Sequence, residues 1–138
     1  MEKDFEILDH TADVGIIAYG NDMKQAFTNT AKGLFSLITE LDSIEEVLYR
    51  DIELVAPDRE SLLVEWLNEL IYLFDAENVI FKRFDITELN NTRLKARSYG
   101  EKVDSSKHKL KTGVKAATYH MLRVDTTNGC KVQVLFDI

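Results

Sequence analysis

Apolar and polar residues alternate near the start of the chain and then change to helical spacing. Alternation over residues 5–7 and 14–18 predicts two short strands. Over 23–38 the apolar side chains share one helical face, so we expect an amphipathic helix with Asp22 as its N-cap. Gly33 interrupts this helix, and a residue without a side chain there predicts close packing against a neighbouring element.

The middle of the chain predicts a strand followed by a second helix. Apolar positions over 47–56 indicate the strand, and Pro57, the only proline, is followed by Asp58, which suits a helix N-cap. Large apolar side chains then form a broad stripe between residues 62 and 74. A stripe of that width indicates burial, and Trp66 in its middle is expected to be a core residue.

The last third of the chain changes to a period of two. We expect strands over 79–86, 93–98, 114–125 and 130–138, with a tight turn at Thr127-Asn128-Gly129. The polar, lysine-rich segment 100–113 is expected to be a mobile loop. Strands and helices without regular alternation indicate an α+β fold, in which a largely antiparallel sheet packs with two main amphipathic helices in a single domain, residues 1–138.

Composition narrows the class of protein. The chain has 138 residues, 45% of them apolar and 30% charged, which is ordinary for a soluble globular protein. A single cysteine, Cys130, excludes an internal disulfide framework and a cysteine-based zinc site. No apolar stretch is long enough for a bilayer, and Met1-Glu2-Lys3-Asp4 does not open a signal peptide, so a cytoplasmic protein without membrane contact is expected.

Charge disfavours one class of partner. The chain carries 24 acidic and 17 basic residues, giving a net charge of −7. A uniform acidic field repels phosphate backbones, so stable direct binding of nucleic acid is not expected. The negative charge either keeps the protein soluble or favours a basic partner or a hard cation.

The chain concentrates costly polar groups in Asp9-His10-Thr11-Ala12-Asp13-Val14-Gly15. Two carboxylates, an imidazole and a hydroxyl stand between two predicted strands, where buried charge needs a partner or a metal. Asp13 therefore reads either as the cap of a polar turn or as a ligand. The spacing of this stretch leaves both interpretations open.

Asp137 favours the ligand interpretation. It is penultimate in the chain, in a final strand whose other face carries only apolar side chains. A carboxylate in such a strand requires a cation or a basic partner. Calcium takes six or more oxygen ligands, so a site assembled from Asp13, Asp137 and the Ile138 terminus with acidic residues after the first helix, Glu40 and Asp42, is predicted.

Lys115 and Tyr119 share one face of the strand predicted over 114–125, together with Ala117, Met121 and Arg123. The two residues are either ordinary exposed side chains of the strand or a contact point for an acidic patch or a phosphate. The spacing does not decide between these interpretations. No Gly-rich phosphate loop, nucleophile elbow, dinucleotide fingerprint or EF-hand spacing is present, and His10, His108 and His120 lie in unrelated segments.

Motifs along essentially the whole chain resemble those of the archease family. They are, in order, Asp9 to Gly15, Gly33-Leu34-Phe35 through Thr39, Leu62-Leu63 to Trp66-Leu67-Asn68-Glu69, Lys107-His108, Val114-Lys115-Ala116 with Thr118-Tyr119-His120, and Phe136-Asp137-Ile138. The resemblance implies an α+β fold with a calcium-type cation held by acidic residues. It also implies an accessory role: archeases assist the RNA ligase RtcB, which joins tRNA exons, by promoting guanylylation of the ligase and multiple turnovers. A tRNA cytosine methyltransferase is a second implied partner.

The resemblance also assigns roles to residues. Asp13 and Asp137 match the family's N-terminal and penultimate acidic ligands, and Glu40 stands where Asp is usual. Lys115 matches the lysine implicated in acting on the ligase, with Tyr119 and His10 as further partner contacts. Cys130 stands where an aromatic residue is frequent, which indicates a change in packing.

Two other functions fit the residues. One is a metal-dependent hydrolase or nucleotide-modifying enzyme, with Asp13 and Asp137 as ligands and His10 or His120 as base. The other is an interaction domain whose carboxylates only satisfy one another. The leading hypothesis is a non-enzymatic, metal-binding activator of the ligase.

Overall fold

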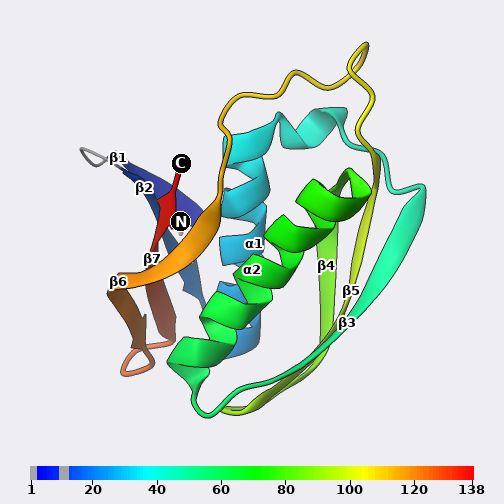
Figure 1. Ribbon diagram of the computed structural model, residues 1–138. Coiled ribbons are helices and arrows are strands. Elements are labelled where there is room, and N and C mark those ends of the chain that lie inside the picture. The colour runs from blue at the N-terminus through cyan, green and yellow to red at the C-terminus, as the bar shows by residue number, and fades with distance from the viewer. Residues whose placement is uncertain (1–2, 10–12) are drawn as a thin grey trace.

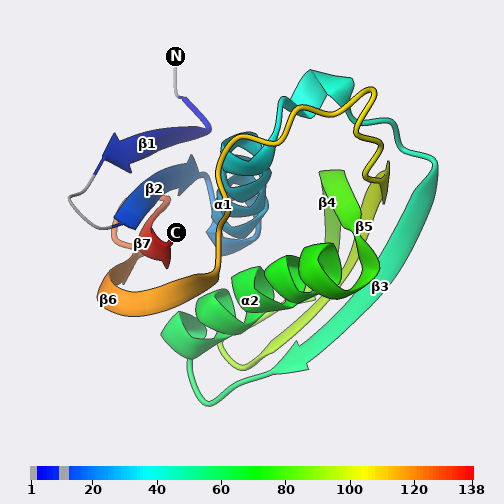
Figure 2. The same ribbon diagram turned by 45° about the horizontal axis from the view of Figure 1, so that its top comes forward.

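The computed structural model describes residues 3–9 and 13–138 and places two helices between two antiparallel sheets (Figure 1, Figure 2). The first sheet has the strand order β1-β2-β7-β6, and the second has the order β3-β5-β4. The strands of the first sheet are β1 (Phe5–Asp9), β2 (Asp13–Gly20), β7 (Cys130–Asp137) and β6 (Ala116–Asp125). Those of the second are β3 (Leu48–Val55), β5 (Arg93–Lys102) and β4 (Val79–Leu89).

The helices are α1 (Met23–Ile38) and α2 (Arg59–Glu77), with a short 3-10 turn, η1 (Leu41–Ser43), after α1. Helix α1 contacts β2 and β7 on one side and β4 on the other, while α2 contacts β6 and the whole second sheet. The predicted α+β class with two packed helices is confirmed. The division of the strands into two sheets is a finding of the structure.

Both helices begin where the sequence predicts. The Asp22 carboxylate accepts a hydrogen bond from the Gln25 N–H at 2.8 Å, and Asp58 accepts one from the Ser61 N–H at 2.7 Å. Each bond satisfies a backbone donor that has no partner in the first turn of a helix. The hydrogen bonds from Ser61 also lower the pKa of Asp58.

The core lies between the helices and the sheets. Trp66 is fully buried, as predicted, and its indole N–H donates to the Phe27 carbonyl at 3.1 Å. The Trp66 ring meets Phe84 edge-on at 6.0 Å, and Phe35 meets Phe81 edge-on at 5.6 Å. This geometry suits the charge distribution of aromatic rings, so the aromatic cluster fixes both helices against β4.

The segment 103–115, which we call the strap, joins β5 to β6 and passes over the end of α1 (Figure 1). The predicted loop over 100–113 is confirmed for residues 103–113, whereas residues 100–102 continue β5; the mobility of the loop stays a prediction. The strap is attached to the end of α1, because the N–H groups of Lys111 and Thr112 donate to the Ile38 and Leu37 carbonyls at 2.8 and 3.2 Å.

A buried histidine fastens the other end of the strap. His108 is 3% exposed; its Nδ1 accepts from the Asp104 N–H at 2.9 Å, so Nε2 carries the proton and donates to Glu101 at 3.0 Å. Glu101 also accepts from Lys107 at 2.9 Å and from the Glu45 N–H at 2.7 Å. These hydrogen bonds define the backbone path of the lysine-rich strap.

Strand β6 is irregular in its middle. Thr118 pairs with Leu135 and Arg123 with Gln133, so four residues of β6 lie opposite one residue of β7, and Met121 adopts a left-handed backbone with φ 55°. The prediction that Ala117 and Arg123 lie on one face of the strand is therefore wrong. Ala117 is on the buried face, whereas Arg123 lies on the opposite face together with Thr118. A single period of two cannot anticipate an insertion within a strand.

Gly33 packs against Ile16, as its position in the helix predicts. A Cβ atom on Gly33 would lie 2.9 Å from Ile16 Cγ2, and Ile16 is fully buried. We expect Gly33→Ala to lower the free energy of unfolding by about 1–3 kcal/mol, because overpacking outweighs the better helix propensity of alanine. Urea unfolding measures the effect. Gly113→Ala is the control, since a Cβ there meets nothing within 4 Å; equal effects of the two substitutions would contradict the packing account.

Glu101 makes stability depend on pH. Burial by itself raises the pKa of Glu101, but hydrogen bonds from the Glu45 N–H, Lys107 and His108 outweigh it and leave the pKa lowered. A carboxyl group with a lowered pKa stabilises the fold above its unfolded pKa of about 4.3, and this contribution is lost as the pH falls through the folded value.

We therefore expect Glu101→Gln to cost about 1–3 kcal/mol at pH 7 and to reduce the loss of stability between pH 5 and pH 3. Urea unfolding across this pH range measures both effects. Glu53→Gln, on an exposed position of β3, is the control carboxylate. The same pH profile for Glu101→Gln and the wild type would exclude Glu101 as a source of acid sensitivity.

Candidate functional site

The first residue of β2 lies directly opposite the last residue of β7. The antiparallel register pairs Asp13 with Asp137, then Val14 with Phe136, and continues to Gly20 and Cys130. Residues directly opposite each other project to the same face, with Cβ atoms about 5 Å apart. Two carboxylates from distant parts of the chain, which we call the strand-end pair, thus meet at one end of the two central strands of the sheet.

The strand-end pair is electrostatically unfavourable without a counter-charge. Like charges directly opposite each other destabilise a strand pair. Asp13 is half-buried and Asp137 is exposed, so the first carboxylate has less access to solvating water than the second. A hard cation suits this donor set, because carboxylate oxygens are the ligands that such ions prefer. The register therefore brings the two predicted acidic ligands, Asp13 and Asp137, opposite each other, and their binding of a cation stays a prediction.

Lys115 joins the strand-end pair through the backbone. Its N–H donates to the Asp137 carbonyl at 2.8 Å, just before Ala116 pairs with Asp137 in the β6–β7 ladder. The Lys115 side chain is exposed, and Ile138, 47% exposed, directly follows Asp137. Asp13, Lys115, Asp137 and Ile138 together form what we call the strand-end site.

Glu40 has a different environment. Its carboxylate accepts from Lys111 Nζ of the strap at 3.1 Å, and its side chain is 74% exposed. No contact between Glu40 and the strand-end pair is present, and within residues 3–9 and 13–138 no group of three or more His, Cys, Asp or Glu side chains is arranged to hold a metal. The third ligand therefore stays a prediction, as does Asp42, which is exposed in η1.

Of the two other predicted contact residues, Tyr119 is described by the structure and His10 is not. Tyr119 is 58% exposed in the irregular part of β6, four residues beyond Lys115 and next to His120, which is also exposed. His10 lies outside the described residues. The structure thus places Lys115 beside the strand-end pair and leaves Tyr119 accessible on β6, the strand that begins directly after Lys115.

Two residues that hold the site in place were missed from the sequence. The Asn68 side chain of α2 accepts from the Ala117 N–H at 2.8 Å and donates to its carbonyl at 3.4 Å, which fixes the start of β6. Thr118 Oγ1 donates to the Leu135 carbonyl at 2.9 Å. The sequence did contain a signal for Asn68: its amide lies between Leu67 and Leu70 in an apolar stripe, and a polar group in such a position needs a hydrogen-bond partner.

Comparison with known proteins shows the family of the chain. The family model described as the Archease protein family (MTH1598/TM1083) matches residues 5–138. The chain belongs to the archease family. It is 38% identical over 141 residues to the protein archease of Methanosarcina mazei, covering 99% of this chain and 97% of that protein. It is 40% identical over 126 residues to the protein archease of Sulfolobus acidocaldarius, covering 91% of each.

Solved archease-like structures share the fold. The solution structure of Methanobacterium thermoautotrophicum protein 1598 has a TM-score of 0.85 at 33% identity and covers 99% of this chain and 100% of that chain. The crystal structure of a Thermotoga maritima archease, described as a possible chaperone, has a TM-score of 0.66 at 21% identity, covering 100% and 98%. The archease membership inferred from the motifs is confirmed.

Among the described residues, neither α1 nor α2 combines the length and the apolar content that a bilayer-spanning helix needs.

Proposed function

We propose that this chain is a non-enzymatic accessory protein that activates the RNA ligase RtcB, by promoting guanylylation of the ligase and multiple turnovers in tRNA splicing and RNA repair. Membership of the archease family supports an accessory role. The observation that carries the proposal is the register of β2 and β7, because it brings Asp13 and Asp137 face to face beside Lys115.

In this proposal each residue of the strand-end site has a distinct task. Asp13 and Asp137 would hold a hard divalent cation, such as Ca²⁺, because carboxylate oxygens are the ligands that such ions prefer. Glu40 would join them only after releasing Lys111. The Lys115 side chain is exposed, and its backbone N–H is bonded to the Asp137 carbonyl. This bond fixes the point from which the side chain would reach the partner.

The charge of the chain agrees with an indirect role in RNA metabolism. At a net charge of −7, the protein is poorly suited to hold a phosphate backbone, whereas the ligase would bind RNA and nucleotide itself. The archease then needs only to meet the ligase, and its acidic surface disfavours competition for the RNA.

A single-turnover guanylylation assay of the ligase tests this function. We expect the wild-type chain to raise the rate of ligase guanylylation. Lys115→Ala is expected to reduce this increase at least tenfold, and Asp13→Asn or Asp137→Asn is expected to reduce it to a similar extent. Lys24→Ala is the matched control, because Lys24 is an exposed lysine near the start of α1.

The assay separates the proposed function from its alternatives. An unchanged ligase rate with the wild-type chain would contradict the activator role. Turnover of a nucleotide or phosphoester by the chain alone, abolished in Asp137→Asn, would instead establish the hydrolase or nucleotide-modifying alternative. Equal effects of Lys115→Ala and Lys24→Ala would remove Lys115 from the proposal.

Calorimetry with CaCl₂ tests the cation separately. We expect one binding event per chain, lost in Asp137→Asn and retained in Asp125→Asn, because Asp125 lies at the opposite end of the β6–β7 pair and caps the turn at Thr127. Binding that survives in Asp13→Asn and Asp137→Asn alike would place the cation elsewhere.

A further inference from the structure

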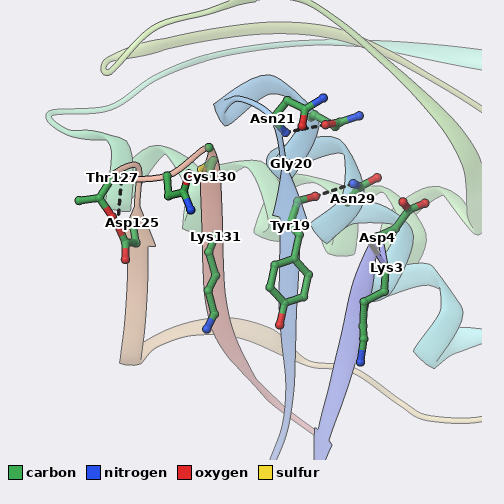
Figure 3. Close-up of a pocket in the computed structure, with 13 residues that line it drawn as sticks. Lys3, Asp4, Tyr19, Gly20, Asn21, Asn29, Asp125, Thr127, Cys130 and Lys131 are labelled. Carbon is green, nitrogen blue, oxygen red and sulfur yellow. Dashed lines mark hydrogen bonds between the residues drawn. The ribbon is translucent and has the colours of Figure 1, made fainter. Parts of the chain in front are cut away.

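A groove of about 760 Å³ lies at the end of the first sheet remote from the strand-end site (Figure 3). Its walls come from the residues before β1, the first half of α1, and the turn between β6 and β7. Strand β2 runs from Asp13 to Gly20, so the two places are separated by roughly 23 Å of extended chain. The groove has the volume of a ligand site, but its lining is polar, with Tyr19 as its aromatic residue.

Three side-chain amides line the α1 wall of the groove. Asn21 directly precedes the N-cap Asp22, whereas Gln25 and Asn29 are four residues apart in α1 and so lie on one side of the helix. Gln25 Oε1 accepts from the Asn21 N–H at 2.6 Å, and Asn29 Nδ2 donates to the Tyr19 carbonyl at 2.7 Å, as Figure 3 shows. These bonds fix both amides.

The same two bonds leave half of each amide available. Asn29 is only 5% exposed, and its Oδ1 accepts no hydrogen bond from the described residues. Likewise, Gln25 Nε2 donates none within them. A positioned acceptor and a positioned donor therefore stand a helical turn apart at the groove, where they can pair with the N–H and C=O groups of a peptide.

Lys131 supplies a positive charge of the groove that is not held in a close ion pair. Its Nζ lies 5.9 Å from the centre of the Tyr19 ring, and it interacts with Glu6 and with Asp125, its partner in the β6–β7 register, through longer-range attraction. The other charged groups of the groove have closer partners. Lys3 lies 3.5 Å from Glu6, Asp4 lies 3.8 Å from Lys32, and Asp125 accepts from the Thr127 N–H and hydroxyl at 3.0 and 2.7 Å.

We infer that the groove binds an extended, polar segment of a partner polypeptide that carries one carboxylate. The amides of Gln25 and Asn29 pair with its peptide groups, and Lys131 pairs with the carboxylate. A monoanion fits better than a phosphate, because Asp4 and Asp125 line the groove and repel a dianion more strongly than a monoanion. The proposal is independent of the ligase, since no residue of the strand-end site lines the groove.

A positional-scanning library of fluorescein-labelled, C-terminally amidated hexapeptides tests the inference by fluorescence anisotropy. We expect at least fivefold tighter binding when one fixed position is Asp or Glu rather than Asn or Gln. Lys131→Met is expected to reduce this preference to below twofold, and Lys24→Met to retain it. Lys131 and Lys24 are both exposed, so neither substitution disturbs the core.

Amide NMR spectra of ¹⁵N-labelled protein with the best peptide locate the contact and confirm that the variants are folded. Side-chain shifts of Asn21, Gln25 and Asn29 are expected. The inference is overturned if no position prefers an acidic residue, if the preference survives in Lys131→Met, or if the shifts map elsewhere. Stronger binding of phosphoserine than of Glu at that position would overturn it in favour of a phosphate site.

Discussion

The antiparallel pairing of β2 with β7 is the contact on which the rest of the molecule depends. It joins the beginning of the chain to its end at the centre of the first sheet, with eight successive residue pairs from Asp13–Asp137 to Gly20–Cys130. On its buried face, Ile16 and Val134 form the surface against which α1 packs. At its two ends lie the strand-end site and the groove, so one ladder positions both.

The strap explains how a lysine-rich segment becomes part of a defined surface. Its backbone is tied to the carbonyls at the end of α1, and the buried His108–Glu101 pair holds its other end to β5. Lys115 emerges where the strap meets β7. The position of this lysine therefore depends on residues far from the strand-end pair, and a change in the strap would reach the site without touching it.

Much of the fold follows from local sequence, because its determinants are local. Asp22 and Asp58 cap their helices through bonds three residues away, and Gly129 takes the left-handed backbone, φ 73°, at the predicted turn. The strap and the middle of β6 do not follow. His108 is buried and hydrogen-bonded to Glu101, a carboxylate of β5 seven residues before it, and the Gln133 side chain donates to the Met121 carbonyl of the insertion at 2.9 Å. Side-chain bonds of this kind leave no periodic signal in the sequence.

The candidate site shows the same division. That Asp13 and Asp137 belong together was predictable from an apolar final strand ending in a carboxylate, and the register confirms that they face each other. The environment of Glu40 was not predictable, because its partner Lys111 lies 71 residues away in a segment without regular secondary structure. No sequence motif predicts the groove, because its amides and Lys131 come from separate elements of the fold.

A double-mutant cycle on Asp13 and Asp137 tests the central claim, that these carboxylates act as one cation-binding pair. The free energy of unfolding is measured for wild type, Asp13→Asn, Asp137→Asn and the double variant, with EDTA and with saturating CaCl₂. The account predicts an unfavourable coupling of about 0.2–1 kcal/mol in EDTA, which becomes favourable with calcium. A coupling energy that is zero in both conditions, or unchanged by calcium, would contradict it.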